Sequence, residues 1–252
     1  MSDFLGRSLL WAGRTFAVAV LLAMLAPFVY AVLISFAPGE LLELPTDRWS
    51  LRWYREFLES SRWLGALRTS AEVAALSVTG SLIGGLGLAL AVTRFHFSGR
   101  QLLSSLVLLP IFVPAVVLAM GLLPVMMTTG LRGTTVAISV AHSLVSLPVV
   151  FLLLHSTLSQ VDPLLEQAAR GLGAGPLVAF SRVTFPLIYP AVLAGVVIAC
   201  ILSVNEFILA VFLSTPRVRT LPAALWPMAR DKETPLLAAS SCSMVLVTLV
   251  GM

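Results

Sequence analysis

Two acidic side chains stand inside the long apolar runs of this 252-residue sequence, and they are the first candidates for chemistry. Glu206, with Asn205 beside it, lies near the end of one run, and Glu72 lies near the start of another. A carboxylate in lipid is costly, so such a residue marks a binding site or a transport path by default. We therefore predict that Glu206, Asn205 and Glu72 face a path that takes a small cationic solute.

A third apolar run carries a stripe of hydroxyl and imidazole groups. Ser139, His142 and Ser146 recur at the spacing that places side chains on one face of a helix. The stripe could line the same path, but His142 could instead hydrogen bond to a neighbouring helix. Glu72 also has a structural alternative, an ion pair with Arg68 one helical turn earlier. The sequence leaves these alternatives open.

Catalytic chemistry is not indicated. A P-loop needs a glycine-rich turn followed by lysine and serine or threonine, whereas the single lysine, Lys232, lies between Asp231 and Glu233. Cys200 and Cys242 are far apart and lack metal-ligand spacing. No set of serine, histidine and carboxylate residues suggests a nucleophile. We predict no enzyme, no metal and no cofactor bound by this chain, so another chain or an ion gradient must drive any transport.

The composition is that of a membrane protein. Hydrophobic residues make up 58% of the chain and charged residues 11%, whereas soluble domains contain about 25% charged residues. The 16 Lys and Arg residues are scattered between apolar runs and form no stripe for nucleic acid. We predict an all-α polytopic protein, a single domain over residues 1–252 in the lipid bilayer. Six transmembrane helices are predicted at residues 16–36, 70–93, 102–126, 134–158, 187–213 and 236–252.

Three of these runs have distinctive features. Pro110, Pro114 and Pro124 predict a kink in the third run. Small residues recur every four positions along the second run, a spacing that lets helices approach closely in lipid. They are Ser77, Ser81, Gly85 and Ala89. The last run is short for a crossing, so either the span is short or the natural chain continues beyond Met252.

Residues 159–186 form an insert that is neither a short loop nor a span. Asp162 and Pro163 predict a helix start, Gly173 predicts its end, and Pro176 predicts the start of a second short helix that runs to Pro186. The first helix is amphipathic, with one apolar and one polar face. Its apolar face comprises Leu164, Leu165, Ala168 and Leu172, and its polar face Glu166, Gln167 and Arg170. The apolar face could dock into a groove on a partner, or pack against the protein's own spans or the lipid headgroups.

The insert also resembles a known motif. Gln167-Ala168-Ala169, three residues, Gly173, nine residues and then Val183-Thr184-Phe185-Pro186 are similar to the EAA loop of ABC-importer permeases. That pattern is Glu-Ala-Ala, three residues, Gly, nine residues and Ile-x-Leu-Pro, so Gln167, Val183 and Phe185 depart from it. Residues 51–58, 141–148 and 203–207 resemble segments of polyamine-type permeases. We call residues 159–186 the coupling segment.

The resemblance implies a permease subunit of a spermidine/putrescine-type importer in the bacterial inner membrane. Its expected partners are a second homologous permease, two ATP-binding subunits that carry ATP and Mg and dock at residues 162–186, and an extracytoplasmic substrate-binding protein. The implied contacts to the ATP-binding subunits are Glu166, Gln167, Ala168, Ala169, Gly173 and Pro186.

The resemblance also implies an orientation. The coupling segment is cytoplasmic in the family, which places the N-terminus in the cytoplasm. A count of six positive residues inside against ten outside argues mildly for the reverse.

Several alternatives remain at this stage. Related sugar, ferric-ion and thiamine permeases leave the substrate open. A gradient-driven secondary carrier is expected to show an inverted repeat and charged residues at the membrane midplane, and neither is clear here. A membrane-embedded enzyme is a third alternative, which the missing catalytic constellation disfavours.

Overall fold

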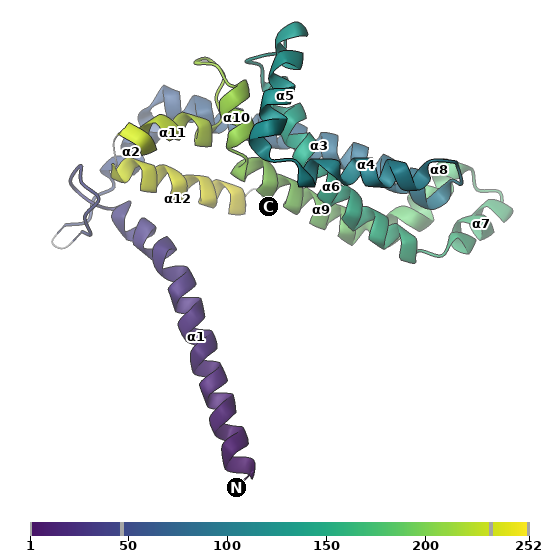
Figure 1. Cartoon of the computed structure of the whole chain (residues 1–252), viewed down its shortest axis with the longest axis horizontal. Coiled ribbons are helices and arrows are strands. Elements are labelled where there is room, and N and C mark those ends of the chain that lie inside the picture. The colour runs from purple at the N-terminus through teal and green to yellow at the C-terminus, as the bar shows by residue number, and fades with distance from the viewer. Residues whose placement is uncertain (1, 46–47, 232–233, 251–252) are drawn as a thin grey trace. The chain divides into compact units, whose positions relative to one another are not determined.

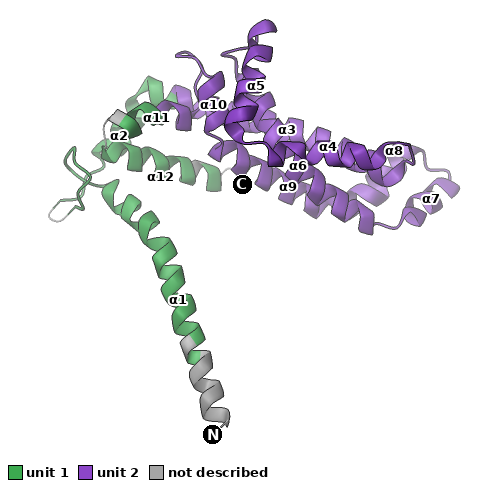
Figure 2. Cartoon of the chain, viewed as in Figure 1, with its two compact units in different colours: residues 1–64, 225–251 green, residues 65–224, 252 purple. Residues whose placement is uncertain are grey.

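The fold is helical, as predicted. A computed structural model describes residues 2–45, 48–231 and 234–250, and every regular element in these ranges is a helix. The chain divides into two compact units, residues 1–64 with 225–251 and residues 65–224 with 252 (Figure 2). This division does not test whether residues 1–252 act as one functional domain, which stays a prediction.

The first unit contains α1 (Ser2–Ile34), α2 (Arg52–Glu59) and α12 (Pro235–Val250), and both α1 and α2 contact α12. The short amphipathic α2 buries Trp53 and Phe57. It is tied to the chain after α1, because Trp53 Nε1 donates a hydrogen bond to the Ala37 carbonyl at 2.9 Å. The Tyr54 and Ser35 hydroxyls lie 2.7 Å apart. Burial raises the pKa of the Tyr54 hydroxyl above its ordinary value of 10.0, so it stays protonated.

The second unit is built around α6 (Figure 1), which contacts α4, α5, α9 and α10. Its core near the coupling segment includes Phe151 and Leu154 of α6 and Ile188 and Ala199 of α9. The principal helices are α3 (Ser61–Arg94, with residues 65–94 in this unit), α4 (Arg100–Phe112), α5 (Ala115–Thr128), α6 (Thr135–Gln160), α9 (Phe185–Asn205) and α10 (Ile208–Leu213). A further helix, α11 (Leu221–Asp231), crosses the boundary between the units.

The predicted face of small residues on α3 is buried, which confirms the prediction. Ser77, Ser81 and Ala89 have no exposed surface. At Gly85, an added Cβ would lie 2.9 Å from Val150 Cγ1 and 3.2 Å from the backbone nitrogen of Phe151. Small residues therefore let α3 and α6 approach to backbone contact, the usual way of packing helices without a hydrophobic driving force.

We expect Gly85→Leu to destabilise the protein, because the contact with the Phe151 backbone cannot move aside. Overpacking of this kind costs about 1–3 kcal/mol. A thermal melt of the detergent-solubilised chain, with the yield of monodisperse protein, measures the loss. Gly87→Leu is the matched control on the same helix, since nothing lies within 4 Å of a Cβ there. Equal melting temperatures for the two variants would contradict close packing at Gly85.

The predicted count of six transmembrane helices is not confirmed. Four helical stretches in the described residues are long and apolar enough to cross a membrane: Gly13–Ile34, Ser61–Arg94, Thr135–Gln160 and Pro176–Asn205. The pair α4 and α5 makes a fifth if it is one span, but it bends by 106°. The bend lies at Val113 and Pro114, as the prolines predicted. The apolar part of α12, Pro235–Leu246, is shorter than the other spans.

Two predicted boundaries of the fifth span and the helix before it are wrong. The span predicted at residues 187–213 ends at Asn205, because Glu206 and Phe207 interrupt the helix before α10. The helix predicted to stop at Pro186 continues through it into α9. A proline ring normally clashes with the carbonyl four residues earlier. Here a π-helical turn, η1 (Phe180–Thr184), directly precedes α9 and opens the backbone at that point.

Candidate functional site

The coupling segment begins with a capped helix, α7 (Pro163–Gly171), as predicted. Asp162 Oδ1 accepts a hydrogen bond from the backbone N–H of Leu164 at 2.9 Å. Pro163 occupies the first turn, where its missing N–H has no partner to lose. The local sequence therefore fixes where α7 starts.

The end of α7 depends on Gly173. Its φ of +91° lies in the left-handed region, which glycine adopts without strain. The N–H of Gly173 bonds to the Arg170 carbonyl and the N–H of Ala174 to the Ala169 carbonyl, each at 3.0 Å. This pair of bonds is a Schellman motif. It turns the chain toward the short helix α8 (Pro176–Ala179).

The apolar face of the coupling segment is open. In the described structure α7 buries none of its side chains, and Leu164 is 64% exposed. Beyond the end of α7, Leu172 is 90% exposed, and Leu177 on α8 is 83% exposed. The packing of this face against the protein's own spans, one of the two alternatives, is therefore not observed. We call Leu164, Leu165, Leu172 and Leu177 the coupling surface.

The predicted contacts to the ATP-binding subunits divide into two groups. Gln167, Ala168, Gly173 and Pro186 are exposed, and Ala169 is half-buried. Glu166 of α7 is instead half-buried and contacts the end of α3. Its Oε1 accepts hydrogen bonds from Arg94 Nε at 3.1 Å and from the Thr184 hydroxyl at 2.5 Å. Sequence reasoning missed Arg94, although its position at the end of an apolar run, on the side of the coupling segment, was a usable signal.

The predicted polar stripe on α6 is buried inside the second unit. His142 is 1% exposed, and its Nδ1 lies 3.0 Å from the Ser203 hydroxyl of α9. The hydroxyl of Ser146 donates to the His142 carbonyl, and that of Ser139 donates to the Thr135 carbonyl. His142 therefore makes the interhelical contact that its structural alternative predicted, whereas Ser139 and Ser146 bond within α6. A role for Ser139, His142 and Ser146 in a path stays a prediction.

The candidate acidic residues have local partners. Glu206 lies in the break between α9 and α10, is partly exposed, and accepts a hydrogen bond from the N–H of Leu209 at 3.1 Å. Asn205 is exposed and donates to the Ile201 carbonyl. Glu72 pairs with Arg68 at 2.8 Å, as its structural alternative predicted. Glu206 is therefore the acidic candidate whose carboxylate has a backbone donor and, among the described residues, no ion pair.

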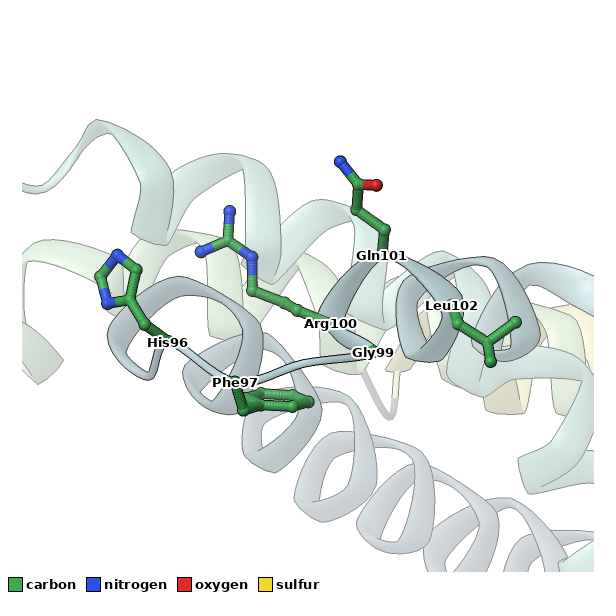
Figure 3. A pocket seen from close by; sticks show the side chains of 6 residues that line it. All are labelled: His96, Phe97, Gly99, Arg100, Gln101 and Leu102. Atoms are coloured by element: carbon green, nitrogen blue, oxygen red, sulfur yellow. The ribbon is translucent and has the colours of Figure 1, made fainter.

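Two hollows lie where α3 ends and α4 begins. One, of about 560 Å³, is lined by a single stretch of chain from His96 to Leu102 (Figure 3). In that view the side chains of His96, Arg100 and Gln101 extend to one side, away from Phe97. The other, of about 290 Å³, lies between the end of α3, the start of α4 and the end of α6. Arg100 lines both hollows.

The described chain combines long apolar helices with an exposed amphipathic helix, α7, after α6. Residues 82–252 match the family described as binding-protein-dependent transport system inner membrane component. The chain belongs to this family and is a permease subunit of an ABC-type importer, a multi-pass inner membrane protein. Subunits of this kind are not catalytic.

Several curated relatives cover most of the chain. It is 30% identical over 218 residues to the putrescine transport system permease protein PotI of Escherichia coli K12, covering 83% of this chain and 77% of the relative. It is 26% identical to the spermidine/putrescine permease PotC of the same organism, over 93% of this chain and 89% of the relative. It is 27% identical to the sulfate permease CysT of Salmonella typhimurium, over 87% and 84% of the two chains.

Solved structures share the fold. A chain of a bacterial ABC transporter that imports the acidic polysaccharide alginate matches with a TM-score of 0.73 at 15% identity, covering 97% of this chain and 92% of that one. In the alginate transporter complexed with its pentasaccharide-bound periplasmic protein, the TM-score is 0.76 at 16% identity, with 99% and 93% coverage. At these identities the likeness shows the fold alone.

Proposed function

We propose that this chain forms half of the translocation path of an ATP-driven importer for a polyamine or a similar small cation. The observation that carries the proposal is the exposed coupling surface on a permease fold, in a chain whose relatives include the putrescine permease PotI and the spermidine/putrescine permease PotC. The partly exposed carboxylate of Glu206 suits a cationic solute. The similarity to a sulfate permease keeps an anion as the competing substrate class, beside sugars, ferric ion and thiamine.

The proposal includes the assembly. A second homologous permease completes the path, two ATP-binding subunits carry ATP and Mg and dock at residues 162–186, and an extracytoplasmic binding protein delivers the solute. The coupling segment is cytoplasmic in this arrangement, and so is the N-terminus. The Arg94–Glu166 ion pair supports the orientation in part, since it brings the end of α3 to the same side as the coupling segment.

An uptake screen of the assembled complex tests the proposal. We expect proteoliposomes that contain all subunits and ATP to accumulate putrescine or spermidine, and these solutes with the binding protein to stimulate ATP hydrolysis. Sulfate, a sugar, thiamine and ferric ion serve as competitors. Uptake of one of these competitors, without uptake of a polyamine, would show that the proposed substrate class is wrong. Uptake that needs an ion gradient and no ATP would favour a secondary carrier.

We expect Glu206→Gln to lower the kcat/KM of polyamine uptake by roughly 10-fold, because it removes a charge-assisted contact with the solute. Glutamine keeps an oxygen that can accept from the Leu209 N–H, so the start of α10 and the yield of complex stay unchanged. Glu59→Gln, at an exposed position of α2, is the control for loss of one negative charge. Unchanged uptake kinetics in Glu206→Gln would count against a path-facing role.

A further inference from the structure

We propose that Arg94 and Glu166 form a clasp that fixes α7 to the membrane helices and transmits its movement to them. The inference rests on the proposed function, because it assigns the residues through which the coupling segment acts. Arg94 and Glu166 are positioning residues in this reading. They hold α7 and do not touch the solute.

The Glu166 carboxylate contacts Arg94 and Thr184, and Arg94 in turn contacts Val161. Arg94 is the last residue of α3, and its Nε donates to Glu166 Oε1 at 3.1 Å. Its Nη2 donates to the carbonyl of Val161, directly after α6, at 3.3 Å. The hydroxyl of Thr184, which has no exposed surface and ends the π-helical turn before α9, donates to the same Oε1. A displacement of Glu166 therefore acts on α3, α6 and α9 together.

The clasp matters because little else holds α7. The helix buries none of its side chains in the described structure, so core packing does not fix its position. The hollow of about 290 Å³ lies beside the clasp and is lined by Arg94, Val161 and Pro163. Packing is thus incomplete where α7 meets the spans. The polar contacts of Glu166, the contacts of α7 with η1 and α8, and the covalent ends of α7 therefore set its position.

Burial makes this ion pair stronger than an ordinary surface pair. The side chains of Arg94 and Glu166 are 14% and 24% exposed. Those of Arg68 and Glu72, the exposed pair on α3, are 84% and 45% exposed. A partly buried, charge-assisted pair is less screened by water and salt than an exposed one. The clasp thus fixes α7 at Glu166, in its first half.

A double-mutant cycle in the assembled complex tests the clasp. We expect Arg94→Gln and Glu166→Gln each to lower the uptake per ATP hydrolysed by roughly tenfold, since each leaves a charge without its partner. The double variant should show an uptake per ATP no lower than that of the less active single variant, because the two residues act through one contact. ATP-binding subunits remain attached in all three. Single variants with wild-type coupling, or losses that multiply to roughly a hundredfold in the double variant, would overturn the proposal.

Hydrogen exchange supplies a readout that does not need transport. In the purified full chain, Glu166→Gln should speed the exchange of the amides of residues 164–171 by roughly tenfold, because the helix opens locally more often. Arg100→Gln, at the same end of the unit, is the control and should leave this exchange unchanged. Equal exchange in Glu166→Gln and the wild type would refute the clasp. A complex without ATP-dependent uptake would refute the proposed function instead, and the exchange result would still decide the clasp.

Discussion

Replacing Gly173 with valine is expected to abolish ATP-driven uptake while the chain still folds and inserts into the membrane. A Cβ at this position meets nothing within 4 Å, so crowding is not the cause. The cause is the backbone, whose φ of +91° costs an L-residue about 1–2 kcal/mol, and more for a β-branched one. Loss of the Schellman motif redirects the chain between α7 and α8, which separates Leu172 from Leu177 on the coupling surface.

The control is valine at Gly171, two residues earlier in the same segment. A Cβ there also meets nothing within 4 Å, and Gly171 lies within the helix. Both variants therefore add the same side chain at an open position, and they differ in the backbone conformation that it must adopt. Uptake and binding-protein-stimulated ATP hydrolysis are the measurements, with membrane yield as the check on folding. Normal ATP-driven uptake in Gly173→Val would contradict a role for the coupling segment in transport.

The sequence predicted those features of the coupling segment that depend on neighbouring residues. The Asp162 cap, the amphipathic α7 and the stop at Gly173 each follow from the chemistry of a few consecutive positions, and the structure confirms them. The end of α9 was harder to predict. Residues 206–213 are almost as apolar as the span before them, so the hydropathy pattern runs on where the backbone breaks at Glu206.

Long-range partners could not be predicted in the same way. Arg94 and Glu166 are 72 residues apart, and only the packing of α3 beside the coupling segment makes them neighbours. The polar stripe of α6 shows a second limit. In a membrane protein, a helical period of polar residues identifies one face of the helix. It does not say whether that face meets a transport path or another helix, because polar side chains serve at both. The Ser203 hydroxyl that contacts His142 comes from α9, a partner that no spacing within α6 indicates.

Replacing Leu172 with aspartate is expected to release the ATP-binding subunits from the complex. Leu172 is 90% exposed in the chain alone, at the centre of a sequence that also exposes Leu165 and Leu177. A dry docking groove would have to bury the new carboxylate without a partner. That burial costs several kcal/mol, enough to weaken association by roughly 100-fold or more. Because the Leu172 side chain itself is almost fully exposed, the substitution should leave the fold of the permease unchanged.

Co-purification measures this effect directly and needs no knowledge of the solute. The matched control is Phe97→Asp, which adds the same charge at an exposed apolar residue outside the coupling segment, in the loop before α4. We expect the ATP-binding subunits to remain with Phe97→Asp and to be lost with Leu172→Asp, at equal amounts of membrane-inserted permease. Retention of the ATP-binding subunits by both variants would show that they do not dock at the coupling surface. Loss from both would show that an added negative charge disrupts assembly at either position, which would count against docking at the coupling surface in particular.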